Sequence, residues 1–169
     1  MYSTIRNILI VIGFLVPTNE PIKKISKHTS RIAAVQVMYQ KDVADIDFEK
    51  TSANFLNNFI NKEDDYKDIN LSFYKRLLKH FPESDDFEET INKNIQNERS
   101  VVSSNVIIKS IIKVAMIEMI FEKTDMPIII NEFIEISRYF LDEKGVKFMN
   151  AVLDAISKQV ERKCLIKAQ

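Results

Sequence analysis

The 169-residue chain has few of the residues that turns, cofactor loops and disulfides require. It contains two glycines, four prolines and one cysteine. All-β folds and doubly wound α/β folds need many glycines in their turns, so this scarcity favours helices joined by short polar loops. No glycine-rich phosphate loop is present, which argues against a nucleotide-binding enzyme. The single cysteine, Cys164, excludes an internal disulfide and a cysteine-based metal cluster.

Charge is balanced overall but unevenly distributed. The formal net charge is zero, which excludes a simple polybasic binder. Residues 42–68 and 83–89 are acidic, whereas residues 22–31 contain four cations and no acid. The cations are Lys23, Lys24, Lys27 and Arg31. Such asymmetry supports a local anion-binding patch on a neutral protein.

The N-terminal segment differs from the rest of the chain. An apolar run, Ile8 to Val16, is too short to span a bilayer, and no small-residue cleavage site follows it. We therefore expect residues 1–25 to be an extension in front of one domain at residues 26–165, in a cytoplasmic protein without a membrane anchor. An export signal and a start codon assigned too early are the alternatives.

Apolar spacing of three and four residues predicts an all-α fold with about seven helices. The expected helices are 26–43, 47–61, 69–81, 85–96, 103–121, 129–141 and 145–163. Asp47 and Ser84 are expected to cap the second and fourth helices, and Pro82 to end the third. The fifth helix is apolar on several sides and should be central. The Ile128 to Ile130 run is compatible with helix or with extended chain.

Catalytic and metal-binding patterns are weak. His28 and His80 are the only histidines, and neither has a carboxylate spaced to orient it as a general base. Acidic pairs such as Asp64–Asp65 and Asp85–Asp86 fall in an expected loop or at a helix start, where acids need no metal. We predict no catalytic residue, no metal site and no cofactor.

The basic start of the first helix is a better functional signal. Lys27, His28 and Arg31 fall where the helix dipole and free backbone N–H groups also favour anions. These side chains suit RNA phosphates, although a short basic run is also typical of a solvated helix face.

Several segments resemble the bacterial transcription antitermination factor NusB family. They are Ser30 to Gln40 (SRIAAVQVMYQ), Ser110 to Met119 (SIIKVAMIEM), Ile130 to Ser137 after Pro127 (INEFIEIS), Val146 to Asp154 (VKFMNAVLD) and, more loosely, Phe73 to Leu78 (FYKRLL). The resemblance covers most of residues 27–158. It implies a non-enzymatic fold of about seven helices in two packed bundles.

The resemblance also implies a function and partners. NusB-like proteins bind boxA RNA of ribosomal RNA leader transcripts together with NusE, a protein of the small ribosomal subunit. Other Nus factors and RNA polymerase join indirectly, and premature termination is suppressed. Two alternatives are a helical protein-interaction module without RNA binding and a homodimer that masks its own RNA surface. NusB-like domains also precede RNA methyltransferase domains, but the 169 residues contain no glycine-rich cofactor fold, so we do not expect catalysis.

Site residues follow from the same resemblance. The RNA surface is expected at the basic arm and at the Lys-Phe-x-Asn motif, with Phe148 stacking on an unpaired base. These residues are Lys27, His28, Arg31, Lys147, Phe148 and Asn150. Asn131 and Glu132 are expected to cap and brace the sixth helix. Candidates for the NusE contact are Tyr39, Tyr74 and Arg76.

Three features depart from the family pattern. Only three residues separate Pro127 from the Asn131–Glu132 pair, so the entry to the sixth helix should differ. Lys113 stands where the family often has arginine, which removes bidentate hydrogen bonding. Ala151 replaces the glycine that follows the Phe-x-Asn motif.

Overall fold

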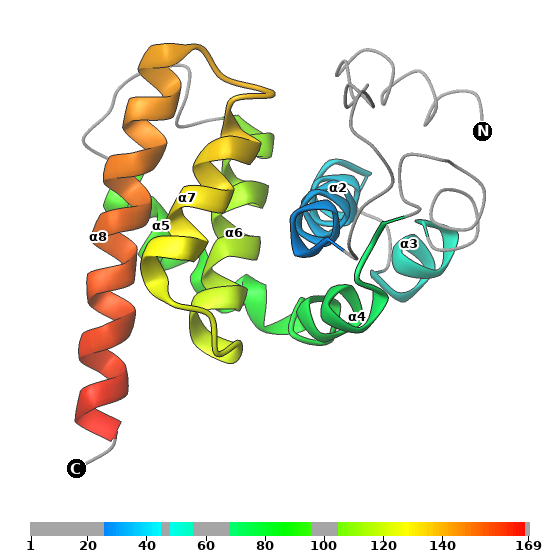
Figure 1. Cartoon of the computed structure of the whole chain (residues 1–169), viewed down its shortest axis with the longest axis horizontal. Coiled ribbons are helices and arrows are strands. Elements are labelled where there is room, and N and C mark those ends of the chain that lie inside the picture. Colours follow the sequence, from blue (N-terminus) through cyan, green and yellow to red (C-terminus); the bar gives the residue numbers. More distant parts are fainter. Residues whose placement is uncertain (1–25, 45–47, 56–67, 96–104, 168–169) are drawn as a thin grey trace.

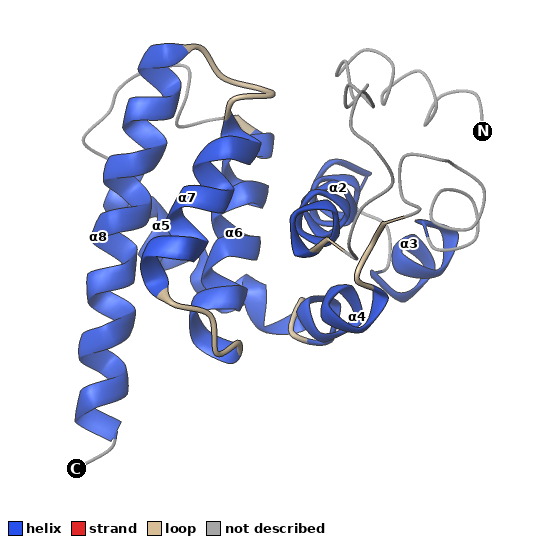
Figure 2. Cartoon of the chain, viewed as in Figure 1, coloured by secondary structure: helices blue, strands red, loops and turns tan. Residues whose placement is uncertain are grey.

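The computed structural model describes residues 26–44, 48–55, 68–95 and 105–167, and these fold almost entirely into helices (Figures 1 and 2). The elements are α2 (Lys27–Ala44), α3 (Phe48–Phe55), α4 (Leu71–Lys79), the 3-10 helix η3 (Pro82–Phe87), α5 (Glu88–Ile95), α6 (Val106–Phe121), α7 (Met126–Ser137) and α8 (Glu143–Lys167). Within these ranges one isolated bridge, Ser26 to Ile69, is the only β-type pairing. The predicted all-α fold is confirmed; the extension 1–25 and Asp47 lie outside the described residues.

Helix α6 is the central helix, as its all-round apolar sequence predicts. Asn105 caps it by accepting a hydrogen bond from the Ile107 N–H at 3.1 Å. Residues 111–119 are all buried. The helix packs against α2, α4, α7, α8 and η3, and in Figure 1 it stands between α2 and the α7–α8 pair.

The other helices form two groups around α6. Helix α2 packs against α3 and α4 on one side of the molecule. Helices α7 and α8 pack against each other and against α6 on the other side, with α5 against α8. The large contact between α2 and α6 joins the groups into the predicted pair of bundles (Figure 1).

The prediction that Ser84 caps the fourth helix is wrong. Pro82 opens a 3-10 turn through Phe87 instead, since its fixed φ suits a first helical position. Ser84 lies inside this turn, fully buried, and its hydroxyl points at the Met38 sulfur at 3.8 Å. Helix α5 therefore begins later, at Glu88.

The start of the sixth helix also differs from expectation. Helix α7 begins at Met126, so the Ile128 to Ile130 run is helical rather than extended. Pro127 is tolerated because the N–H groups of a first turn have no partner within the helix. Asn131 is consequently an exposed residue inside the helix and does not cap it; Asp125 holds the N-cap position.

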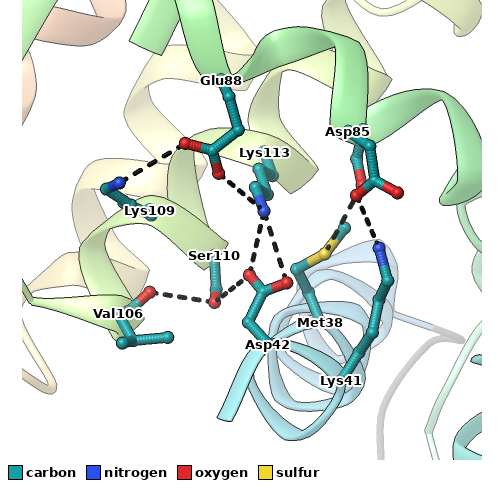
Figure 3. A network of polar contacts seen from close by, with 10 residues as sticks. Met38, Lys41, Asp42, Asp85, Glu88, Val106, Lys109, Ser110 and Lys113 are labelled. Carbon is teal, nitrogen blue, oxygen red and sulfur yellow. Dashed lines mark hydrogen bonds and ion pairs between the residues drawn. The ribbon is translucent and has the colours of Figure 1, made fainter. Parts of the chain in front are cut away.

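A partly buried ion-pair network ties α2 to α5 and α6 (Figure 3). The Lys113 ammonium of α6 lies 3.2 Å from the Asp42 carboxylate of α2 and 3.1 Å from Glu88 of α5. The Ser110 hydroxyl and Lys109 extend the network, at 3.4 Å from Asp42 and Glu88 respectively. A lysine can therefore fill the position where arginine was expected, because two carboxylates converge on one ammonium.

The network shifts two pKa values toward the charged forms. Burial raises the pKa of Glu88, but hydrogen bonds and charges from Lys113 and Lys109 outweigh it, so the pKa lies below its ordinary value. Burial lowers the pKa of Lys113, and contacts with Glu88 and Asp42 more than offset it, so this pKa lies above its ordinary value. Both groups are therefore ionised near neutral pH.

Replacing Lys113 with alanine should lower the free energy of unfolding at pH 7 by about 3 kcal/mol, because it leaves the largely buried Asp42 carboxylate without the Lys113 cation and leaves Glu88 paired with Lys109 alone. The loss should shrink below about pH 4, since a carboxyl group with a depressed folded pKa stabilises the fold only while it is ionised. Urea unfolding at several pH values measures both effects. Lys93→Ala, which removes an exposed pair with Glu89, should cost under about 0.5 kcal/mol. Equal losses for the two variants would contradict the prediction.

Candidate nucleic-acid interface

The start of α2 is fixed by a small hydrogen-bonded joint. The Ser26 hydroxyl accepts from the Thr29 N–H at 3.3 Å and so caps the helix. The Ser26 N–H donates to the Asp68 carbonyl, and the Asn70 N–H donates to the Ser26 carbonyl at 3.3 Å. The Thr29 hydroxyl also donates to the Asp68 carboxylate at 3.0 Å. The basic end of α2 is thereby held against the segment that leads into α4.

Arg31 lies in the interior at this joint. Its side chain donates two hydrogen bonds of 2.7 Å to the Glu118 carboxylate of α6, and a third nitrogen lies 3.1 Å from Glu132 of α7. Arg31 is 2% exposed and Glu118 is fully buried. A bidentate pair with this geometry satisfies both groups away from water. Arg31 thus joins α2 to α6 and α7, and little of it reaches the surface.

His28 and Glu132 form the half-exposed rim of the same cluster. The His28 Nδ1 atom lies 2.8 Å from the Glu132 Oε2 atom. The hydrogen bond from His28 lowers the pKa of Glu132; burial opposes this shift and the Arg31 charge adds to it, so the pKa falls below its ordinary value. Glu132, expected only to brace its own helix, therefore orients the His28 and Arg31 side chains of α2.

Three cations surround the buried Phe73 ring of α4. The Lys27 ammonium lies 4.9 Å from the ring centroid, and the guanidinium carbons of Arg31 and Arg76 lie at 5.2 and 5.5 Å. Distances under about 6 Å permit cation–π attraction. Lys27 is exposed and forms no ion pair with a described carboxylate. Of the basic-arm residues that the structure describes, Lys27 offers the most open charge for an anionic ligand.

The second part of the expected surface lies on α8. Lys147 and Asn150 are exposed, and Lys147 pairs with Glu143 at 3.1 Å. Phe148 is half-buried and packs against the hydrophobic core. The face of this helix therefore presents a cation and an amide, with the aromatic ring only partly accessible.

Glu132 on α7 and the Lys147–Asn150 segment on α8 lie at a similar distance from the turn that joins these two helices. Helices α7 and α8 are consecutive and packed together, joined by the turn at residues 138–142. Glu132 lies five residues before the end of α7, and Phe148 lies five residues after the start of α8. Each residue of a helix advances about 1.5 Å along its axis, so residues the same number of positions from the turn lie side by side in an antiparallel pair. Glu132, which holds His28 and Arg31, is thus level with the Lys147–Asn150 segment.

The residues expected to contact a protein partner do not share one environment. Tyr39 is partly buried against the core, and Tyr74 is fully buried, with its ring 6.4 Å from the Phe55 ring. Arg76 is exposed and donates hydrogen bonds of 2.8 and 3.0 Å to Glu122. Arg76 is therefore the only one of the three with a largely accessible side chain.

Sequence reasoning missed Glu118 as part of this cluster. It is a lone acid between apolar residues of the central helix, and a buried carboxylate requires a cationic partner. The need of Glu118 for a cationic partner was the signal in the sequence that could have predicted its pairing, and Arg31 is that partner. No group of three metal-binding side chains occurs among the described residues. None of the described helices is long and apolar enough to cross a membrane.

The fold and this cluster define an all-helical protein in which buried charged side chains join the two groups of helices. A model of the NusB family matches residues 28–158, so the chain belongs to the NusB family. The match lies inside the predicted domain at residues 26–165. Family membership also agrees with the prediction that the protein is not an enzyme.

Two relatives illustrate the similarity. The transcription antitermination protein NusB of Clostridium botulinum is 31% identical over 137 residues, covering 79% of this chain and 99% of the relative. That of Sinorhizobium medicae is 26% identical over 150 residues, covering 85% and 94%. Both relatives are matched over nearly their whole length.

Solved structures support the fold. T. maritima NusB superposes with a TM-score of 0.63 at 22% identity, over 80% of this chain and 93% of that one. A complex of the antitermination factors NusB and NusE with double-stranded RNA gives a TM-score of 0.60 at 22% identity, over 79% and 96%. The two-bundle arrangement is therefore shared with both structures.

Arg31→Ala and Glu118→Ala should each lower the free energy of unfolding by about 3–5 kcal/mol, because each leaves a buried charge unpaired. The double variant Arg31→Met with Glu118→Leu should lose less than either single variant, since two apolar side chains fill the space without an unpaired charge. Urea unfolding of the three variants measures this. Arg138→Ala, which removes an exposed pair with Glu135, is the control and should cost under about 0.5 kcal/mol. Additive losses in the double variant would refute the coupling.

Proposed function

We propose that this protein acts in transcription antitermination, binding boxA-type RNA together with NusE. Membership of the NusB family carries the proposal, because the named relatives are transcription antitermination proteins. A structural neighbour that contains NusB, NusE and RNA supports the same pair of partners. Other Nus factors and RNA polymerase are proposed as indirect partners, and the cytoplasm as the compartment of action.

The RNA surface is proposed to run from the start of α2 across α7 to α8. Lys27 and Lys147 are exposed cations that can neutralise phosphates, and each such contact releases counterions. Asn150 is exposed and carries an amide that can bind a base edge. Phe148 contributes the accessible part of its ring to base contact.

Arg31 and His28 have different proposed roles on this surface. Arg31 is a positioning residue: it fixes the start of α2 through Glu118 and Glu132 and is too buried to meet a phosphate directly. His28 uses Nδ1 toward Glu132, which leaves its other ring nitrogen for RNA. The expected arm is thus divided into a buried half that orients and an exposed half that binds.

NusE is proposed to contact the side of the molecule where Arg76 is exposed. Arg76 carries its charge beside Glu122, so both signs are available for a polar contact. Tyr39 and Tyr74 are less accessible than Arg76, because Tyr39 is partly buried and Tyr74 is fully buried. A homodimer that covers the RNA surface is the second candidate arrangement, and light scattering at several concentrations tests it.

Lys27→Ala and Lys147→Ala should each flatten the salt dependence of RNA binding. A lost phosphate contact lowers the slope of log affinity against log salt by about 0.7 for a single strand. Fluorescence anisotropy of a labelled boxA-type RNA, titrated with protein and with equimolar NusE, measures the slope. Lys93→Ala on α5 is the charge-matched control and should leave it unchanged.

Two results would count against the proposal. Absence of RNA binding at low salt, with and without NusE, would refute the function as a whole. An equal slope change for Lys93→Ala would show that net charge, rather than the proposed surface, governs affinity.

A further inference from the structure

The turn between α7 and α8 carries an aromatic side chain that lies largely outside the core. Tyr139 is 46% exposed, whereas Phe140 and Leu141 of the same turn pack against the core. We propose that Tyr139 is a base-stacking residue that holds one nucleotide of single-stranded RNA. This inference rests on the proposed RNA-binding function and adds a residue that lies outside the expected RNA surface.

The turn holds Tyr139 in a defined position. The Tyr139 N–H donates to the Ile136 carbonyl at 3.2 Å, and the Leu141 N–H donates to the Ser137 carbonyl at 3.0 Å. The Gly145 N–H donates to the Asp142 carboxylate at 2.8 Å, which starts α8 directly after the turn. A ring on an ordered backbone loses little conformational entropy when it binds, and this favours stacking.

Gly145 permits this tight turn. A Cβ atom at residue 145 would lie 3.0 Å from the Leu141 Cβ and 3.2 Å from the Asp142 carboxylate. Both contacts are closer than a side chain normally allows, so the absence of a Cβ lets the turn close against the first turn of α8. The close packing of Leu141 and Asp142 against α8 therefore depends on one of the two glycines in the chain.

Cations lie close to Tyr139 along the chain, on both sides of the turn. Arg138 is next to it in sequence, and Lys144 and Lys147 lie in the first turns of α8, where side chains tilt toward the helix start. Lys144 forms no ion pair with any described residue. Arg138 and Lys147 pair with Glu135 and Glu143 at 3.3 and 3.1 Å, but these pairs are exposed and weak, so phosphates can replace them.

The surroundings favour RNA over a protein partner. The core of a protein interface is depleted of charge, whereas single-stranded nucleic acid is bound by an aromatic ring between cations. Other exposed apolar side chains, Ile120, Phe121 and Ile128, occur around the opposite end of α7, where it follows α6. Tyr139 is thus an exposed aromatic side chain that follows Arg138 in sequence and lies at the other end of α7 from these apolar side chains.

The accessible ring also complements Phe148. Phe148 packs against the core and exposes only part of its ring, so it cannot offer a full face to a base. Tyr139 precedes the same helix and is more open. Two neighbouring nucleotides of one strand can therefore contact the turn and the second turn of α8.

The absence of tryptophan allows a direct test. Tyr139→Trp introduces a single tryptophan whose fluorescence should be quenched by a single-stranded boxA-type RNA, with the midpoint found by anisotropy of the labelled RNA. Val43→Trp places the probe at a similarly exposed position on α2, 44% exposed, and should not be quenched. Binding without quenching at residue 139 would overturn the inference.

Affinity measurements separate stacking from charge. Tyr139→Ala should weaken RNA binding by roughly tenfold, while Tyr139→Phe should stay within about twofold of the unchanged protein, because stacking needs the ring and not the hydroxyl. The salt slope should be unaffected by Tyr139→Ala, in contrast to Lys147→Ala. Equal affinity for the alanine variant would overturn the stacking role.

The possible failures are distinguishable. If RNA binds normally to Tyr139→Ala, the stacking inference fails and the proposed function stands. If the fluorescence of the Tyr139→Trp variant responds to NusE alone and not to RNA, the turn is a protein contact and the inference fails. If no RNA binds to the unchanged protein with or without NusE, both the function and the inference fail.

Discussion

The buried pair between Arg31 and Glu118 is the interaction on which the rest of the structure depends. It crosses the contact between α2 and α6, which joins the two bundles. Two charges removed from water require close partners with satisfied hydrogen bonds, and the bidentate geometry supplies them. Because the pair works in only one relative position of the two helices, it sets the register between the bundles as well as holding them together.

A second polar contact fixes the other end of α2. Asp42, near the C-terminus of α2, meets Lys113 of α6, while Arg31 meets Glu118 near the N-terminus of α2. The two contacts use opposite polarity, since α2 supplies the cation at one end and the anion at the other. A reversed α2 would therefore place Arg31 near Lys113 and Asp42 near Glu118, so that like charges would meet. Apolar packing alone gives no such discrimination between registers.

Much of the fold was predictable because helix periodicity and composition report burial directly. The apolar α6 was expected at the centre and lies there. The two wrong predictions concern helix starts next to a proline. Pro82 opens a 3-10 helix that includes Ser84. Pro127 lies in the first turn of α7, which therefore begins earlier than its apolar pattern suggests. Proline fixes φ in a way that suits both a helix start and a break, so sequence alone does not decide between them.

The site was less predictable because a motif identifies residues but not their exposure. Lys27 and Arg31 belong to one basic run, yet the first is exposed and the second is 2% exposed. Four positions along a helix return to nearly the same face, so depth depends on which carboxylate the neighbouring helices supply. Glu118 and Glu132 come from two other helices, and the sequence around Arg31 does not predict that these carboxylates pair with it. The division of a basic arm into buried and exposed residues is therefore a property of the packed bundles.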